Sequence, residues 1–262
     1  MQDGREMARL ETKYVRSVAV SKDDDWIAAW GDVTVWDANT YKQKWWWGTE
    51  RSHGVDFSPN ATRLVVASDD PTATILDLAT GNEVLELVHE ESVLAAKYSP
   101  EGDRIATATS HHVRVWDSED GRMLHQIQVS SDYIFGLVWG YNLLIVTPRD
   151  KVWKIKGTTV SEWSIPETNC NSRFAVQGRG EFVVSTTNRT VRFWDISTHT
   201  ERPPIQHSRD IASVTLSPDD QFIAIDEPEG KITIKRLSHI SVSIAPSSIS
   251  SFPFRVAFYL FH

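Results

Sequence analysis

Apolar and polar residues alternate along most of this chain in short runs that predict β-strands. The runs come in pairs separated by a polar turn, as in VDFSPNATRLVVA and AKYSPEGDRIATA. Alternation with a period of two places every second side chain on one face of a strand, and a bend rich in Pro, Gly, Asp or Asn joins two strands into a hairpin. No stretch has convincing helical periodicity. The pattern therefore predicts an all-β protein.

Runs that close in Trp-Asp, or in a degraded copy of it, recur at a regular spacing. The repeated position is occupied by Trp36, Leu76, Trp116, Trp153, Trp194 and Lys235, at steps of 40, 40, 37, 41 and 41 residues. A turn and a fourth alternating run follow each closing run, so each unit is predicted to hold four antiparallel strands, a to d in chain order. Such a period indicates a repeat architecture.

These motifs carry a resemblance to a known family. The S-P-x-G-like turns paired with V-x-x-W-D runs over roughly residues 12–245 resemble the WD-repeat β-propellers. The resemblance implies a β-propeller of four-stranded antiparallel blades around a central channel. Six repeats are recognisable, whereas the family most often closes with seven. The style of the repeats is also similar to the arrays attached to fungal multidomain signalling ATPases, which is consistent with a larger parent protein.

The repeats predict one propeller domain over residues 1–245 and a non-repeat tail over residues 246–262. The predicted units lie near residues 12–50, 51–88, 89–128, 129–164, 165–207 and 208–245. The tail is either a divergent terminus that packs loosely or an extra strand that helps to close the ring. In the related family the outermost strand of the last blade often comes from the N-terminus, so Met7 to Thr12 competes with Ile240 to Ala245 for that place.

The resemblance also implies which residues are structural. WD repeats commonly hold a His, a Ser or Thr, a turn Asp and the Trp of strand c in one hydrogen-bonded network. The residues that match these positions are Trp36, Trp116, Trp153, Trp194, His89, His207 and Asp70. No unit keeps all four members of the network, and a partly satisfied polar network is destabilising. We therefore expect apolar packing between blades to hold the ring together.

Composition and charge narrow the classes of function. The formal net charge of −8 argues against a general nucleic-acid binder, which usually has a basic face. The single cysteine, Cys170, excludes an intramolecular disulfide and fits a reducing compartment. The N-terminal residues lack the apolar core of a signal peptide, and no apolar run is long enough to span a bilayer. A cytoplasmic location is expected, a nuclear one stays open, and secretion is not expected.

Motifs for catalysis and metal binding fail on inspection. The HEESV segment at His89 begins like a zinc-protease helix, but Val93 stands where the second His is needed. No G-x-S-x-G elbow is present, and one cysteine cannot supply a thiolate set for zinc. Most Asp residues lie in turns, which favour Asp for conformational reasons. We expect no catalytic residue, no metal site and no cofactor.

The resemblance sorts the loops by face. Its strand directions place the b–c turns and the d–a loops together on the top of a propeller. Candidate binding residues on these loops are Trp30, Trp47, Arg51, His111, Tyr133, Arg149, Arg189 and Arg209, accompanied by the acids Asp69, Asp70, Glu227 and Glu229. Arg and aromatic residues are enriched at binding hot spots. The top is therefore the predicted binding face.

The three consecutive tryptophans, Trp45 to Trp47, end the outermost strand of the first unit. Strand alternation sends Trp45 and Trp47 to one face and Trp46 to the other. All three could pack between blades or against the outer strand. Alternatively one of them, with Trp47 beside Arg51 as the candidate, stays exposed as an anchor for a protein or peptide. A membrane contact or a sugar platform is a third possibility.

Three functions stay open at this point. The first is a non-enzymatic scaffold that presents propeller loops to protein or peptide partners, as the resemblance implies. The second is a nucleic-acid or phospholipid reader that uses the arginines of the top face, since a local patch can override a negative net charge. The third is a propeller-type hydrolase with a pocket at the channel mouth, which would need convergent carboxylates or metal ligands on the top loops.

Overall fold

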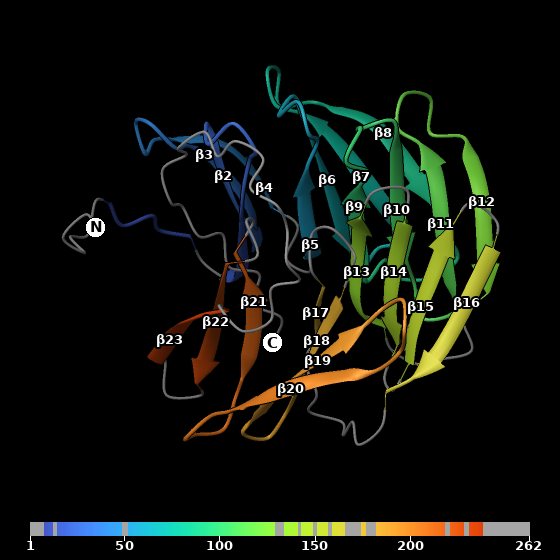
Figure 1. The fold of residues 1–262 in the computed structure, drawn as a ribbon. Helices are drawn as coiled ribbons and strands as arrows, with labels where there is room; N and C mark the ends of the chain where they lie inside the picture. Colours follow the sequence, from blue (N-terminus) through green and yellow to red (C-terminus); the bar gives the residue numbers. More distant parts are fainter. Residues whose placement is uncertain are drawn as a thin grey trace, which may run out of the picture. The chain divides into compact units, whose positions relative to one another are not determined.

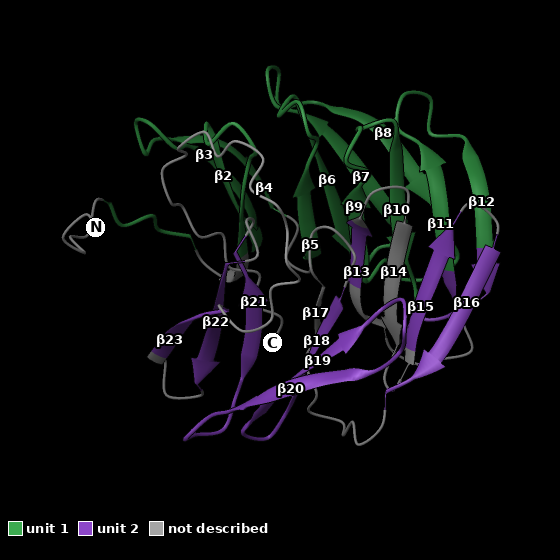
Figure 2. Cartoon of the chain, viewed as in Figure 1, with its two compact units in different colours: residues 1–109, 113–126 green, residues 110–112, 127–262 purple. Residues whose placement is uncertain are grey.

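The computed structural model describes residues 8–12, 15–48, 52–128, 134–140, 143–148, 151–156, 159–165, 174–176, 182–217, 221–227 and 231–237. All regular structure in these residues is β-strand, numbered β1 to β23 in chain order (Figure 1). Consecutive strands pair antiparallel, so each sheet is a simple meander. The chain divides into two compact units (Figure 2), one of residues 1–109 and 113–126 and the other of residues 110–112 and 127–262.

The first unit is built on three four-stranded sheets. The first sheet contains β1 (Val15–Val20), β2 (Trp26–Gly31), β3 (Val33–Asp37) and β4 (Gln43–Trp47). The second sheet contains β5 (Ser52–Phe57), β6 (Arg63–Ser68), β7 (Thr72–Asp77) and β8 (Glu83–Val88). The third sheet contains β9 (Ala95–Tyr98), β10 (Arg104–Ala108), β11 (His112–Asp117) and β12 (Met123–Gln128).

The second unit is built on two four-stranded sheets and one of three strands. The fourth sheet contains β13 (Ile134–Gly140), β14 (Leu143–Pro148), β15 (Lys151–Lys156) and β16 (Thr159–Ser164). The fifth sheet contains β17 (Phe174–Val176), β18 (Phe182–Thr187), β19 (Thr190–Asp195) and β20 (Glu201–Gln206). The sixth sheet contains β21 (Ser213–Leu216), β22 (Phe222–Glu227) and β23 (Lys231–Arg236).

The predicted all-β fold with four-stranded antiparallel sheets is confirmed for five units, and the sixth contains three strands among the described residues. Among the described residues the sixth sheet ends at β23. Of the two segments expected to supply its outermost strand, residues 8–12 are described and form no strand. Met7 and the competing segment Ile240 to Ala245 lie outside the described residues.

The strand register corrects one position of the repeat. In five sheets, the second residue of the second strand pairs with the penultimate residue of the third. These pairs are Ile27 with Trp36, Leu64 with Leu76, Ile105 with Trp116, Val183 with Trp194, and Ile223 with Lys235. In the fourth sheet Leu144 pairs with Ile155, so Ile155 takes the repeated position and Trp153 lies two residues earlier. The flanking steps then become 39 and 39 residues, which is more regular than 37 and 41.

Apolar side chains pack between neighbouring sheets within each unit. In the first unit, Ile75 and Leu87 of the second sheet share a buried cluster with Ile105 and Trp116 of the third. In the second unit, the fifth and sixth sheets bury a cluster of Phe182, Val184, Val191, Phe193, Ile211, Val214, Ile223 and Ile225. Each large side chain buried in this way contributes about 1.5–3 kcal/mol. Packing between sheets is thus the main apolar stabilisation within each unit.

The turns between the third and fourth strands share one conformation. The Asp that ends the third strand accepts backbone and side-chain hydrogen bonds from the turn, as Asp37 does from Thr40 and Asp77 does from Thr80. These bonds hold the pKa of both carboxyl groups below the usual value. The fourth residue after the Asp has a positive φ at Tyr41, Gly81, Gly121 and His199. Glycine is the residue that adopts this conformation without strain.

The outer strand of one sheet packs on this turn of the next sheet. Trp45 lies over Gly81, where an added Cβ would come within 2.5 Å of the indole ring. Leu85 and Leu87 lie beside Gly121 in the same way, at 3.6 and 3.5 Å from such a Cβ. In the second unit Trp163 of β16 stacks on His199, with ring centroids 4.4 Å apart. Trp45 and Trp163, both on outer strands, therefore serve the packing of neighbouring sheets.

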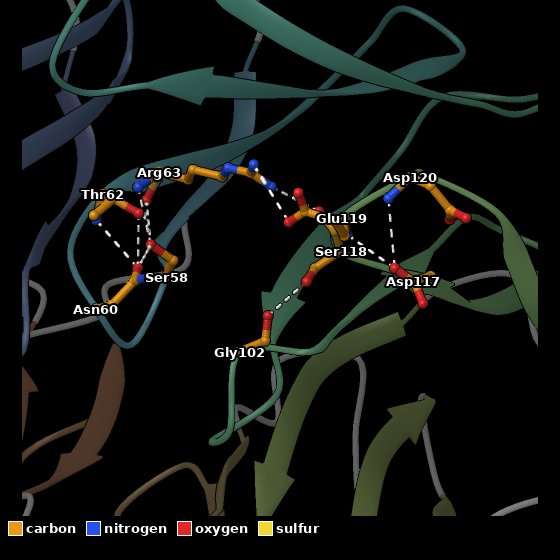
Figure 3. Close-up of polar contacts among 9 residues, drawn as sticks. All are labelled: Ser58, Asn60, Thr62, Arg63, Gly102, Asp117, Ser118, Glu119 and Asp120. Carbon is orange, nitrogen blue, oxygen red and sulfur yellow. Dashed lines mark hydrogen bonds and ion pairs between the residues drawn. The ribbon is translucent and has the colours of Figure 1, made fainter.

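Polar contacts join the second and third sheets at the same end (Figure 3). Arg63, at the start of β6, donates from Nη1 to the backbone carbonyl of Ser118 at 2.9 Å and forms an ion pair with Glu119 at 3.5 Å. The Ser118 hydroxyl donates in turn to the carbonyl of Gly102 at 2.6 Å. The turn of one sheet is thereby tied to the neighbouring sheet by directed bonds as well as by apolar packing.

Candidate interaction surface on the paired loops

The turn between the second and third strands of one sheet is bonded to the loop that leads into the next sheet. In the first unit, residues 68–71 and 89–93 form one such pair, which we call the acidic loop pair. His89 donates its backbone N–H to the carbonyl of Pro71 at 2.7 Å, and Val93 donates to Ser68 at 3.0 Å. The Ser92 hydroxyl adds a bond to the carbonyl of Asp69 at 2.8 Å.

The second unit contains the equivalent arrangement. Residues 188–189 and 207–211, which we call the basic loop pair, are joined by a bond from the His207 N–H to the Arg189 carbonyl at 2.7 Å. A second bond joins the Ile211 N–H to the Asn188 carbonyl at 2.9 Å. Val93 and Ile211, at the same place in the two pairs, are both buried. Each pair is therefore anchored by backbone bonds and an apolar side chain, which leaves its other side chains on a fixed backbone.

A series of buried hydrogen bonds lies beneath the acidic loop pair. Trp116 donates from Nε1 to the Thr107 hydroxyl at 2.8 Å, and that hydroxyl lies 2.8 Å from His89 Nε2. His89 Nδ1 faces the carbonyl of Leu87 at 2.7 Å, so Nδ1 carries the proton and Nε2 accepts from Thr107. Burial lowers the pKa of His89 to about 4, although the bond to Leu87 opposes the shift. His89 is therefore a neutral structural residue.

This series of hydrogen bonds agrees with the prediction that no unit keeps all four members of the network. The third sheet unites His, Thr and Trp, and its turn between β10 and β11 carries Ser110 and His111 in place of an acid. The fifth sheet keeps two members, because Trp194 donates from Nε1 to the Ser185 hydroxyl at 2.9 Å. Sheet packing is thus supplemented by partial networks that satisfy the buried indole N–H groups of these two tryptophans.

The acidic loop pair presents carboxylates. His53 Nε2 lies 2.5 Å from Asp69 Oδ1, and both side chains are partly exposed. Glu90 is exposed and pairs with the guanidinium of Arg114, which is itself buried. Arg114 also donates to the carbonyl of Val88 at 3.2 Å. The position of Glu90 is therefore defined by an arginine held within the protein, while its carboxylate faces solvent.

The basic loop pair presents two arginines above a buried carboxylate. Arg189 and Arg209 are 63% and 52% exposed, and each lies beside a carboxylate. Arg189 Nε lies 3.0 Å from Asp210, and Arg209 Nε lies 3.5 Å from Glu227. Glu227 is buried, with His207 Nε2 at 3.1 Å from its Oε1. The two guanidinium groups are thus positioned by carboxylates, and both side chains remain more than half exposed.

The predicted binding residues fall into three groups. His111, Arg189 and Arg209 are exposed on turns or loops, as a contact with a partner would require. Trp30 is buried, and Trp47 is half-buried and donates from Nε1 to the Gly81 carbonyl at 3.1 Å. Arg51, Tyr133 and Arg149 lie outside the described residues. We therefore leave Trp30 and Trp47 out of the proposed surface.

The residues predicted as structural are also located by the structure. Trp36, Trp116, Trp153, Trp194 and His89 are buried. The side chain of His207 is buried against Glu227. Asp70, expected in the buried network, is exposed, and the adjacent Asp69 contacts His53 instead. Because both acids suit a turn, sequence alone could not choose between them; Glu229 lies outside the described residues.

In the part of the chain that the structure describes, no group of three or more His, Cys, Asp or Glu side chains could hold a metal ion. The same residues include no helix that is long and apolar enough to cross a membrane. The arrangement of the paired loops can bind charged groups.

Comparison with known proteins gives three kinds of match. The family model "WD domain, G-beta repeat" matches residues 81–117, which run from the turn before β8 to the end of β11. A serine-threonine kinase receptor-associated protein of Dictyostelium discoideum is 25% identical over 193 residues, covering 68% of this chain and 65% of that protein. The protein of the same name from Gallus gallus is 22% identical over 216 residues, covering 79% and 51%.

The chain therefore spans between about half and two thirds of the length of these two relatives. Among solved structures, a chain described under "Crystal Structure of Mitotic Checkpoint Complex" is similar with a TM-score of 0.73 and 16% identity. The match covers 86% of this chain and 74% of that one. At this level of identity the likeness shows a shared fold.

Proposed function

Because this chain is a member of the WD-repeat β-propeller family, we propose that it is a non-enzymatic interaction scaffold that binds protein or peptide partners through its paired loops. The observation that carries the proposal is the repeated anchoring of these loops. The same pair of backbone bonds holds residues 68–71 to 89–93 and residues 188–189 to 207–211. Loops on a rigid scaffold are the usual place for binding residues.

The basic loop pair is the surface that we propose as the main contact. Arg189 and Arg209 are more than half exposed and are already oriented by Asp210 and Glu227. Preorganised arginines lose less side-chain freedom on binding, and arginine is enriched at interface hot spots. The partner segment that fits this surface is acidic. The relatives are named as receptor-associated proteins, and the solved neighbour belongs to a complex, which supports a role in assembly.

Because the local charges are balanced, a nucleic-acid or phospholipid reader is the weaker alternative. Each arginine of the basic loop pair has a carboxylate within 3.5 Å, so the surface is mixed in charge and lacks a continuous basic track. Nucleic-acid binding draws its affinity from the neutralisation of several phosphates by unbalanced cations. A surface whose two arginines each lie beside a carboxylate is better suited to an acidic protein segment than to a phosphate backbone.

The test compares the partners captured by two double variants of the full chain, in each of which two arginines are changed to glutamate. Arg189→Glu with Arg209→Glu alters the basic loop pair. Arg104→Glu with Arg122→Glu is the control, because these arginines are also exposed and also lie beside an Asp, outside the paired loops. Affinity capture with mass spectrometry should lose partners only with the first pair, while circular dichroism stays unchanged. An identical partner list for both variants contradicts the proposal.

A further inference from the structure

One of the three consecutive tryptophans is left largely in solvent. Trp46 is 55% exposed, whereas Trp45 and Trp47, on the other face of β4, donate hydrogen bonds to the second sheet. Trp46 lies directly across from Thr34 of β3, so both side chains share the face that is turned away from the second sheet. A ring that can bury about 150–250 Å² in a core or an interface is thus used for neither within the described residues.

The exposure of Trp46 does not come from a missing neighbour. In the second sheet, Glu86 lies across from Thr74 at the equivalent place. Because Leu87 packs towards the third sheet, Glu86 points to the side on which the first sheet lies, and it is nevertheless exposed. The fold therefore leaves this position of an outer strand in solvent even beside a complete neighbouring sheet. A polar residue suits the position, and packing does not require a tryptophan there.

The ring of Trp46 lies over the backbone that follows it. A Cβ added to Gly48 would come within 2.9 Å of Cη2 and 3.0 Å of Cζ2 of the indole. Only a residue without a side chain lets the ring rest against the end of the strand in this way. The ring is therefore oriented before any partner arrives, and a side chain that is already ordered loses little freedom on binding.

Basic residues outnumber acids on the segments around the ring. Residues 8–12 lie on the same face of the first sheet, because the hydroxyl oxygens of Thr12 and Thr34 are 3.3 Å apart. The exposed charged residues of this segment and of residues 42–48 are Arg9, Glu11, Lys42 and Lys44. With three basic residues against one acid, the surroundings of Trp46 favour a negatively charged group, although the whole chain has a net charge of −8.

From these observations we propose that Trp46 anchors an acidic segment of a partner protein on the outer strand of the first sheet. The segment places an apolar side chain on the exposed indole and a carboxylate beside Lys44. These two residues of β4 are two positions apart, about 6–7 Å along a strand, so the two partner residues are two positions apart in an extended segment. A second copy of this chain fits less well, because a symmetric contact would bring the basic residues against themselves. The surface lies in the first unit and does not depend on the basic loop pair.

A library of random peptides displayed on phage provides the probe. Depletion on the Trp46→Ala chain first removes phage that bind the loop pairs or any other surface, and the remainder is selected on the wild-type full chain. The selected peptides should carry Asp or Glu two positions from an apolar residue. Titrated as fluorescein conjugates by anisotropy, they should bind the wild type at least about tenfold more tightly than Trp46→Ala. The control Val88→Ala, at an exposed residue of the outer strand β8, should leave the affinity unchanged.

Two further variants test the orientation of the ring and the charge. Gly48→Ala displaces the ring without removing it and should weaken binding by about two- to fivefold while circular dichroism stays unchanged. Lys44→Glu should weaken binding to a similar extent, and a peptide whose acid is changed to lysine should bind this variant as the original peptide binds the wild type.

Several outcomes would overturn the proposal. It fails if no peptide survives the depletion, if the selected peptides carry no acid, or if the charge exchange gives no rescue. Sedimentation velocity and co-sedimentation with vesicles of phosphatidylcholine and phosphatidylserine examine the other occupants. Dimerisation or vesicle binding that the wild type shows and Trp46→Ala lacks would assign the surface to a second copy or to a membrane, and would also overturn it.

Discussion

Trp45 donates its indole N–H to the backbone carbonyl of Leu78 at 2.9 Å, and this hydrogen bond joins the outer strand of the first sheet to a turn of the second. The ring covers Gly81, and Trp47 donates to the carbonyl of the same glycine at 3.1 Å. Two of the three consecutive tryptophans are therefore part of the interface between these sheets. Trp46, on the opposite face of the strand, is 55% exposed.

Gly81→Ala should be strongly destabilising. A Cβ at this position would lie 2.5 Å from the Trp45 ring, and the φ of +75° is unfavourable for any residue with a Cβ. The two effects together should cost about 2–4 kcal/mol in the free energy of unfolding. Chemical denaturation followed by tryptophan fluorescence measures this loss.

Two other glycines separate the effect of the Trp45 contact from the effect of the positive φ. Gly121→Ala meets only ordinary contacts but has a φ of +71°, so it should cost about 1–2 kcal/mol from backbone strain alone. Gly54→Ala meets no atom within 4 Å and should change stability by less than about 1 kcal/mol. If Gly81→Ala costs no more than Gly121→Ala, Trp45 does not pack on the turn as described.

Thr107→Val should break the series of buried hydrogen bonds beneath the acidic loop pair. Valine has the shape of threonine but neither accepts from Trp116 nor donates to His89, so two buried nitrogen atoms lose their partner. The expected loss is about 2–3 kcal/mol in the free energy of unfolding. Ser185→Ala, which removes the single bond to Trp194, should cost about half as much. Equal losses would show that His89 does not depend on Thr107.

The stability supplied by His89 should depend on pH. Its pKa is about 4 in the folded protein and near 6.5 in the unfolded chain, so only the unfolded chain takes up the proton between these values. Stability is therefore highest above pH 6.5 and falls as the pH is lowered towards 4, by up to about 1.4 kcal/mol per pH unit.

Comparison with a variant that lacks His89 isolates this effect. The advantage of the wild-type chain over His89→Gln should shrink by roughly 2 kcal/mol between pH 7 and pH 5. His111→Gln removes an exposed histidine without touching the series of buried hydrogen bonds and serves as the control. An advantage over His89→Gln that stays constant with pH would show that His89 is accessible to protons in the folded state.

Tyr98→Phe should not destabilise the protein. Burial raises the pKa of Tyr98, and its hydroxyl oxygen is buried with no hydrogen-bond partner among the described residues. Removing the hydroxyl keeps the ring in the cluster with Ile105 and relieves an unmet polar group, so stability should stay equal or rise by up to about 1 kcal/mol. Thermal unfolding checks this, and a clear drop in Tm would show that the hydroxyl has a partner such as a buried water.

The repeat of hairpins was readable from the sequence because alternation and turn residues are local signals. The repeated position of the fourth sheet was assigned to Trp153 because that residue is a tryptophan. The regular spacing of the repeats alone would have selected Ile155, and this assignment is the correct one. The tryptophan run was ambiguous for a different reason. Alternation separates Trp46 from its two neighbours, but which face a neighbouring sheet covers is decided by packing between units of the repeat.

The candidate surface was predictable only in part. The exposed arginines were identified from their place on the loops, but their ion pairs with Asp210 and Glu227 join different segments of the chain and leave no local signature. The choice of Asp69 over Asp70 depends in the same way on where His53 lies.

The most direct measurement is the affinity of a captured partner for three forms of the full chain by isothermal titration calorimetry. The wild type and the Arg104→Glu, Arg122→Glu control should bind within about twofold of each other. The Arg189→Glu, Arg209→Glu variant should bind at least about tenfold more weakly, a loss of about 1.4 kcal/mol. Equal affinities for all three forms would contradict the account of the paired loops as the binding surface.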